Sequence, residues 1–192
     1  MSRRLVHLVV LFIVVGLSGP VGSQPAAYVS PELQRLNVSE QVGQTIPLDI
    51  RLVDDLGQPR LIGDYFRNGK PVIIVMAYYN CPMLCTLVLN GLGEAMRVMS
   101  LQAPRDFTVL TVSIDPGETP PLAAAKKKNY IANVGQAGLE QGWWFFVAEE
   151  KESRRLADSL GFPYFWDEAG KQFAHPAVIM VLTPEGQISR YI

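Results

Sequence analysis

The 192-residue chain has few side chains that can bind a soft metal or act as a nucleophilic thiol. It contains two cysteines, Cys81 and Cys85, and two histidines, His7 and His175. It also lacks an excess of charge, because 17 lysines and arginines nearly balance 18 acidic residues. This composition excludes the basic surface expected of a nucleic-acid-binding protein. Length and a hydrophobic content of 48% predict one domain with a substantial core.

The N-terminus lacks an apolar run long enough to cross a bilayer. Leu5 to Leu17 is nearly all apolar but spans only 13 residues, whereas a membrane-spanning helix needs about 20. Two arginines precede this run and small residues follow it, which predicts an export signal over residues 1–23. An uncleaved membrane anchor is the alternative. We therefore expect an exported protein, in the periplasm or at the outer face of the inner membrane, with a net charge of about −3 once the signal is removed.

Export changes how the two cysteines are interpreted. Outside the cytoplasm thiols tend to oxidise, and many secreted domains are stabilised by disulfides. Cys81 and Cys85 are separated by only three residues, and closing such a short loop removes little entropy from the unfolded chain. A structural disulfide therefore explains this pair poorly. We predict a functional, redox-active dithiol.

Strand-like and helix-like segments alternate along most of the chain. Residues 24–45 are rich in polar and turn-forming side chains and predict a linker or extended arm before a domain at 46–192. Strands are expected at 48–53, 72–77, 107–114, 143–147, 177–182 and 188–192, and helices at 86–101, 121–134 and 149–160. This order predicts an α/β fold with a mixed central sheet, flanking helices and a terminal hairpin. Because the sequence stops inside the last strand, we expect a C-terminally truncated domain, or a partner that covers the exposed sheet face.

The two cysteines lie where the buried strand at 72–77 gives way to a helix. Cys81 falls near the helix N-terminus, where unpaired N–H groups and the helix dipole stabilise a thiolate. Cys85 follows four residues later, so one helical turn brings both sulfurs to the same side. They could form a disulfide or hold one soft metal ion. The spacing is one residue longer than the Cys-x-x-Cys of dithiol oxidoreductases, which favours a shared metal but allows both.

Three segments together resemble the Sco/SenC family of copper-binding cytochrome c oxidase assembly proteins. They are PVIIVMAYYNCPMLCTLVLNGL at 71–92, TVSIDP at 111–116 and FAHPAVIMVLTPEG at 173–186. The resemblance extends from about residue 45 to the end, in the family's order. Two departures are that Thr86 stands where many relatives have a proline, and that the family's final helix does not follow the last strand.

The resemblance implies a thioredoxin-like fold that binds one copper ion through Cys81, Cys85 and His175. It also implies a metallochaperone that helps to assemble the binuclear copper centre of cytochrome c oxidase subunit II, or serves another copper-accepting protein, in association with the membrane-bound oxidase. Copper chemistry agrees, because Cu(I) prefers thiolates and Cu(II) accepts two thiolates with an imidazole. Structural zinc would normally take four protein ligands, and only three strong candidates are available.

Other functions and roles compete with this interpretation. The alternative function is a thiol–disulfide oxidoreductase that keeps the cysteines of oxidase subunit II reduced. A peroxidase or a cysteine hydrolase is disfavoured, because no activating arginine or substrate pocket is indicated. Met83 is more readily explained as a flexible apolar side chain than as a ligand, and Asp115 as the cap of a turn. Tyr78, Tyr79 and Asn80 are candidates for a rim that a docking partner contacts.

Overall fold

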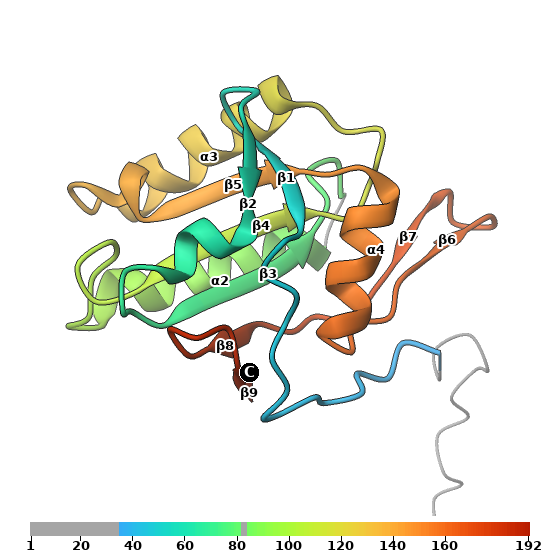
Figure 1. Cartoon of the computed structure of the whole chain (residues 1–192). Helices are drawn as coiled ribbons and strands as arrows, with labels where there is room; N and C mark the ends of the chain where they lie inside the picture. Colours follow the sequence, from blue (N-terminus) through green and yellow to red (C-terminus); the bar gives the residue numbers. More distant parts are fainter. Residues whose placement is uncertain (1–34, 82–83) are drawn as a thin grey trace, which may run out of the picture.

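The computed structural model describes residues 35–81 and 84–192 (Figure 1). Leu84 and Cys85 are described by their backbone only. The predicted export signal, residues 1–23, lies outside the described part, as does the first half of the predicted arm. Within the described ranges, no helix combines the length and the apolar character needed to cross a bilayer.

A seven-stranded mixed sheet forms the centre of the molecule, in the order β2-β1-β5-β4-β3-β8-β9. Its strands are β1 (Arg51–Asp54), β2 (Pro59–Leu61), β3 (Val72–Ala77), β4 (Thr108–Ser113), β5 (Trp143–Val147), β8 (Met180–Leu182) and β9 (Ile188–Tyr191). Strands β3, β4 and β5 run parallel, whereas β1, β2, β8 and β9 pair antiparallel with their neighbours. The predicted mixed sheet and terminal hairpin are confirmed.

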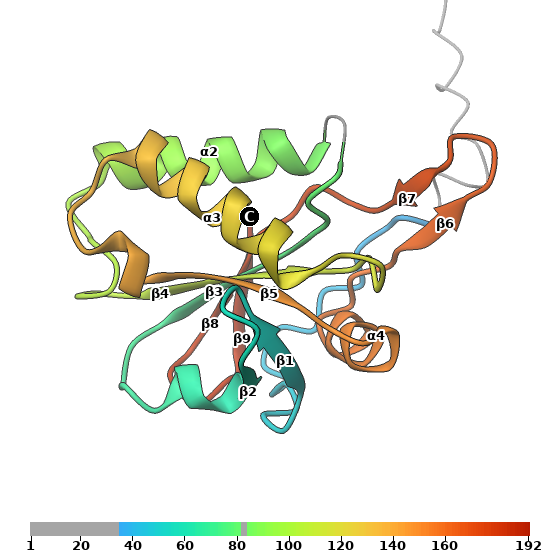
Figure 2. The ribbon, with the colours of Figure 1, turned by 90° about the horizontal axis from the view of Figure 1, so that it is seen from above.

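Helices cover both faces of this sheet. Figure 2 shows α2 (Leu84–Val98) and α3 (Pro120–Val134) on one face, and α4 (Glu150–Ser159) on the other. The structure also contains two short 3-10 helices, η1 (Ile62–Phe66) and η2 (Leu139–Gln141). The three predicted helices are confirmed with shifted ends. Pro120 and Pro121 occupy the first turn of α3, where a missing N–H costs no helical hydrogen bond.

The parallel strands are buried because helices pack on both sides of them. Every residue of β4 is buried, as are all residues of β3 except the partly buried Ile73. In β5, Trp143, Phe145 and Phe146 are fully buried, and the Trp143 indole donates a hydrogen bond to Thr111 Oγ1 at 2.9 Å. The continuous apolar run at 72–77 therefore forms the predicted strand that is buried on both faces.

The structure differs from the sequence expectation in several short strands. The prediction missed β2 and the hairpin of β6 (Phe165–Asp167) with β7 (Gln172–Ala174), which projects from the body in Figure 1. It also began the strand at 177–182 too early. The ladder between β3 and β8 reaches only from Val72–Leu182 to Ile74–Met180, and the residues before Met180 form the connection from β7.

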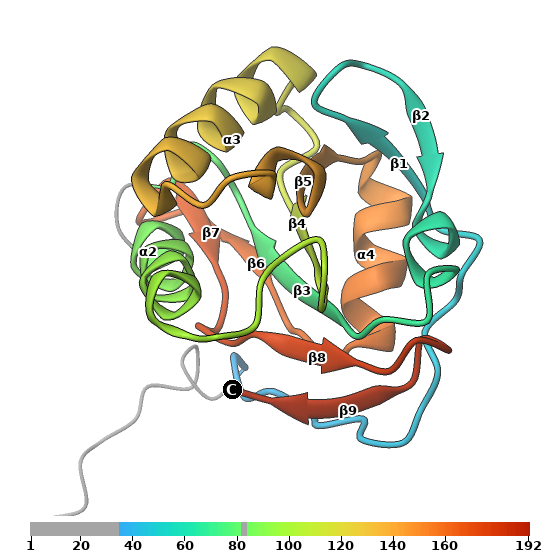
Figure 3. The same ribbon diagram turned by 90° about the vertical axis from the view of Figure 1, so that its left-hand side faces the viewer.

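The described part of the predicted arm packs against the domain. Ser39 N donates to Gly161 O at 3.0 Å, at the end of α4. Gly43 N donates to Ile188 O, and Ile188 N donates to Gln44 O, both at 2.8 Å, so the arm lies along edge strand β9 (Figure 3). Covering an edge strand in this way satisfies backbone groups that would otherwise be open to other chains.

An apolar groove lies between α2 and the β8–β9 hairpin. Its volume is about 460 Å³, and its lining includes Ile73, Leu87, Val88, Ile179 and Ile192. Leu87 and Ile192 are 60% and 70% exposed. The apolar surface expected beside the terminal hairpin is therefore present in the described part of the chain.

Asp54, at the end of β1, carries a fully buried carboxylate. It accepts hydrogen bonds from Gln58 N at 2.8 Å, Arg60 Nε at 2.8 Å and Leu56 N at 3.0 Å. Burial acts to raise the pKa of Asp54, but these hydrogen bonds outweigh it and hold the pKa below its usual value of 3.8. The carboxylate therefore stabilises the turn between β1 and β2 only in its ionised form.

Asp54 should make the folded state sensitive to acid. Because its folded pKa is depressed, the unfolded chain takes up the proton first as the pH falls. The stabilisation is present above about pH 4 and is lost as the pH falls towards the folded pKa. Asp54→Asn should be less stable near neutral pH and should show a smaller loss of stability in acid. Urea unfolding at several pH values would measure this, with the exposed Glu185→Gln as control; equal pH slopes for Asp54→Asn and the wild type would contradict it.

Candidate metal centre

Cys81 lies just beyond the carboxyl end of β3 and just before α2. Its N–H donates to Tyr78 O at 3.3 Å, which closes a turn after the strand. The side chain is partly exposed and packs against the core. In α/β proteins, ligands commonly bind outside the carboxyl ends of parallel strands, and the N-terminus of α2 adds a partial positive charge there. Cys81 is thus placed where a thiolate can meet a ligand or a partner.

Cys85, the second predicted ligand, has its backbone in the first turn of α2. Its side chain lies outside the described part of the structure, as does Met83. Among the described side chains, no group of three or more His, Cys, Asp or Glu residues is close enough to hold a metal ion. The convergence of Cys81, Cys85 and His175 therefore stays a prediction, as does a disulfide between the cysteines.

His175 directly follows β7 and is only 4% exposed. Its ring stacks on Phe162, with centroids 5.9 Å apart, and Nδ1 lies 2.8 Å from Pro176 O. A carbonyl oxygen can only accept, so Nδ1 carries the proton and the lone pair of the neutral ring is on Nε2. Burial lowers the pKa of His175, opposed by the hydrogen bond to Pro176. The neutral ring thus favoured is the form that binds a metal.

Tyr78 connects the histidine to the cysteine segment. Its buried ring meets His175 edge to face, with centroids 5.9 Å apart, and meets Phe173 at 5.6 Å. Tyr78 is also the residue whose carbonyl accepts from Cys81 N. The fold therefore brings His175 against the turn that carries Cys81, although the two residues are far apart in the sequence.

The expectation of a docking rim at residues 78–80 is wrong for both tyrosines. Tyr78 and Tyr79 are only 5% and 3% exposed, because the turn after β3 still packs both side chains into the core. Of the three, only Asn80 is exposed. The Tyr79 hydroxyl donates to Phe146 O at 2.6 Å. Burial, with Glu118 nearby, raises the pKa of Tyr79 well above 10, so the hydroxyl remains a donor.

Glu118, in the loop between β4 and α3, is a residue that the sequence reasoning missed. Its carboxylate accepts hydrogen bonds from Tyr79 N at 2.8 Å, Asn80 N at 2.7 Å and Ser113 Oγ at 2.7 Å. Burial raises its pKa, and the bonds from Ser113, Tyr79 and Asn80 oppose that shift. The available signal was an acidic residue in the loop after β4, because parallel pairing of Ala77 with Ser113 places that loop beside the cysteine turn.

The remaining candidates have structural roles. Asp115 Oδ1 accepts from Gly117 N at 2.8 Å and so caps the turn after β4, as predicted. Met76 and Met96 are buried in the core.

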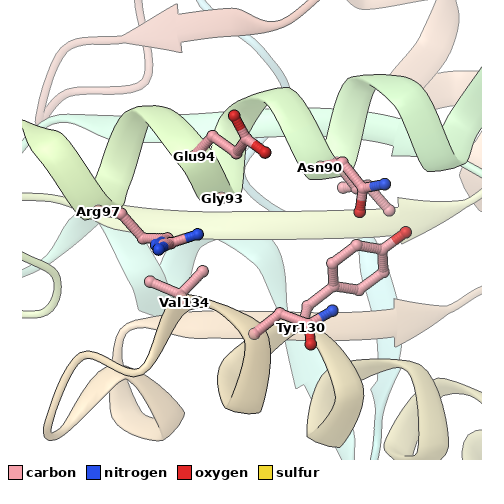
Figure 4. A pocket seen from close by; sticks show the side chains of 8 residues that line it. Asn90, Gly93, Glu94, Arg97, Tyr130 and Val134 are labelled. Atoms are coloured by element: carbon pink, nitrogen blue, oxygen red, sulfur yellow. The ribbon is translucent and has the colours of Figure 1, made fainter.

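A polar pocket of about 290 Å³ lies between α2 and α3, and its lining includes Glu94, Arg97 and Tyr130 (Figure 4). No cysteine or histidine lines it, so it does not suit a soft metal.

Comparisons with known proteins point to one family. The model of the SCO1/SenC family matches residues 39–192. Compared by sequence with curated proteins, the chain has no significant match. A crystal structure of a candidate electron transfer protein from Aquifex aeolicus is 31% identical, with a TM-score of 0.68, and the match covers 79% of this chain and 84% of that one.

Two copper-bound ScoI structures share the thioredoxin-like fold at lower identity. The Arabidopsis thaliana protein is 18% identical, with a TM-score of 0.62 and coverage of 79% of this chain and 87% of that one. The Bradyrhizobium japonicum protein is 21% identical, with a TM-score of 0.57 and coverage of 79% and 88%. The family match over most of the chain, together with the Aquifex relative, shows that this chain belongs to the SCO1/SenC family.

Proposed function

We propose that the chain is a copper metallochaperone that carries one copper ion on Cys81, Cys85 and His175. Family membership supports this proposal, as do the relatives solved with copper bound. The observation that carries it is the placement of His175. Its ring is buried against Tyr78, the residue whose carbonyl closes the Cys81 turn, and the neutral ring has its lone pair on Nε2.

These residues suit a transferable cargo. Two thiolates satisfy Cu(I), and adding an imidazole nitrogen suits Cu(II). Three ligands leave a coordination position open, through which an acceptor's ligand can enter before the carrier's own ligands leave. Cys81 is partly exposed whereas His175 is buried. An acceptor would therefore meet the cysteine side of the site first.

The proposed acceptor is cytochrome c oxidase subunit II, whose binuclear copper centre the chain would help to assemble. Another copper-accepting protein is the alternative acceptor. The export signal predicted at residues 1–23 supports delivery in the periplasm or at the outer face of the inner membrane, next to the membrane-bound oxidase. The near-balanced charge of the chain supports a protein partner over nucleic acid.

Copper titration of the reduced protein tests the carrier function. We expect one equivalent of copper to bind, with thiolate-to-Cu(II) charge-transfer absorption. Cys81→Ser and Cys85→Ser should each lower the copper affinity and change that absorption, because each removes one of the two thiolate ligands. Glu185→Gln, in the turn between β8 and β9, is the control and should bind as the wild type does. Copper binding that is unaffected by the loss of either cysteine would refute the proposal.

The thiol–disulfide oxidoreductase remains the second candidate, favoured by the partly exposed Cys81 beside the N-terminus of α2. In that reaction the Cys81 thiolate would attack a disulfide of the acceptor and form a mixed disulfide. The Cys85 thiolate would then displace the acceptor, which leaves with two thiols, while Cys81 and Cys85 become a disulfide. A mixed disulfide trapped in Cys85→Ser, with His175 dispensable, would favour this function over copper transfer.

A further inference from the structure

We infer that Glu118 is a positioning residue of the proposed copper site, which holds the Cys81 turn in the arrangement that a three-ligand site requires. The inference rests on the proposed copper-binding function. Glu118 is not proposed as a copper ligand. It acts through the backbone of Tyr79 and Asn80, the two residues before Cys81.

The carboxylate binds two consecutive backbone amides with separate oxygens. Oε2 accepts from Tyr79 N at 2.8 Å, and Oε1 accepts from Asn80 N at 2.7 Å. The peptide planes on both sides of Tyr79 are thereby fixed against one planar group. The Tyr79 side chain is anchored separately, by its hydrogen bond to Phe146 O. Cys81 follows directly, so its position depends on these bonds.

Glu118 is itself held from the end of β4. Ser113 Oγ donates to Oε2 at 2.7 Å and accepts from Asp115 N at 3.1 Å, while Glu118 N donates to Asp115 O at 3.2 Å. Ser113 pairs with Ala77 of β3 in the parallel ladder. The carboxylate therefore connects the end of β4 to the turn that follows β3 and carries Cys81.

The charge of Glu118 is held in the interior by hydrogen bonds alone. The side chain is only 7% exposed, and no lysine, arginine or histidine forms a salt bridge with it in the part of the chain that the structure describes. A buried carboxylate is unfavourable unless several donors satisfy it. A neutral glutamine could not replace it, because its NH₂ group would face a backbone N–H that needs an acceptor.

The oxidation states of copper should respond differently to this support. Cu(I) can be held by two thiolates alone, whereas Cu(II) needs the thiolates and the imidazole in one arrangement. Displacing the Cys81 turn relative to His175 should therefore disturb Cu(II) more than Cu(I). Groups that orient metal ligands typically change metal affinity by about 10–100-fold when they are lost.

The experiment compares Glu118→Gln, Glu118→Asp and Ser113→Ala with the wild type, using Cu(II) and Cu(I) titrations and near-ultraviolet circular dichroism. Glu118→Gln should lower Cu(II) affinity about tenfold or more, shift the charge-transfer band and change Cu(I) affinity little. Glu118→Asp keeps the charge and should retain more Cu(II) affinity than the glutamine variant. Ser113→Ala removes one donor and should have a smaller effect in the same direction. Glu185→Gln is the matched control for loss of a carboxylate.

A folded Glu118→Gln protein with wild-type Cu(II) affinity and spectrum would overturn the inference. If that variant does not fold, wild-type Cu(II) binding by Ser113→Ala and Glu118→Asp would overturn it equally. Equal weakening of Cu(I) and Cu(II) would indicate general structural damage and would also count against it. Wild-type protein that binds no copper would instead refute the proposed function, so the two failures are distinct.

Discussion

Replacing His175 with alanine should weaken Cu(II) binding by more than about 100-fold and leave Cu(I) binding largely intact. Loss of a ligand should cost at least as much as loss of a group that orients one, which is about 10–100-fold. Cu(I) retains its two preferred thiolates, whereas Cu(II) loses the nitrogen ligand. Competition titrations with chelators selective for each oxidation state would measure the difference.

The control for this variant must separate ligation from packing. His175 is buried between Phe162 and Tyr78, so alanine also leaves a cavity that could disturb the site. His175→Phe keeps an aromatic ring there but has no lone pair, and it should lose Cu(II) binding to a similar extent. Wild-type Cu(II) binding by a folded His175→Phe protein would show that the imidazole is not a ligand.

Gly161→Ala should destabilise the fold by about 2–5 kcal/mol. Gly161 directly follows the C-cap of α4 and has φ of +58°, and an added Cβ would overlap Ser39 O of the N-terminal arm. The left-handed backbone costs a residue with a Cβ about 1–2 kcal/mol, and forcing the arm away adds about 1–3 kcal/mol. Urea unfolding monitored by tryptophan fluorescence would measure the loss of stability.

Gly135→Ala provides the matched control. Gly135 ends α3 with a similar φ of +69°, but no atom lies within 4 Å of the position of an added Cβ. Its replacement should cost only the backbone term of about 1–2 kcal/mol. The difference between the two variants reports the contact between the arm and α4. Equal losses would show that residues 39–45 contribute little to the stability of the domain.

Local sequence pattern was sufficient for the central elements of the fold. The apolar run at 72–77 and the aromatic run at 143–147 coincide with β3 and β5, because a strand buried on both faces needs apolar side chains at every position. The helix after the cysteines was predicted from the periodic spacing of its apolar residues. Short strands such as β2 and β6, of three residues each, carry too few side chains to show a period.

The sequence by itself determined the chemistry available to this protein. The chain has two thiols four positions apart near the start of a helix, and one histidine, His175, outside the predicted export signal. These side chains restrict the protein to soft-metal or thiol chemistry. The assignment of His175 came from resemblance, since a lone histidine has no periodicity or spacing that marks a ligand.

Only the tertiary structure decided what surrounds those groups. The contact of Tyr78 with His175 and the bonds from Tyr79 and Asn80 to Glu118 join residues that are distant in the chain. Periodicity reports whether one segment is buried, but it does not report which other segment lies opposite. That pairing follows from the parallel register of β3 with β4 in the main sheet and from the separate β6–β7 hairpin, after which His175 follows; both are features of the tertiary structure.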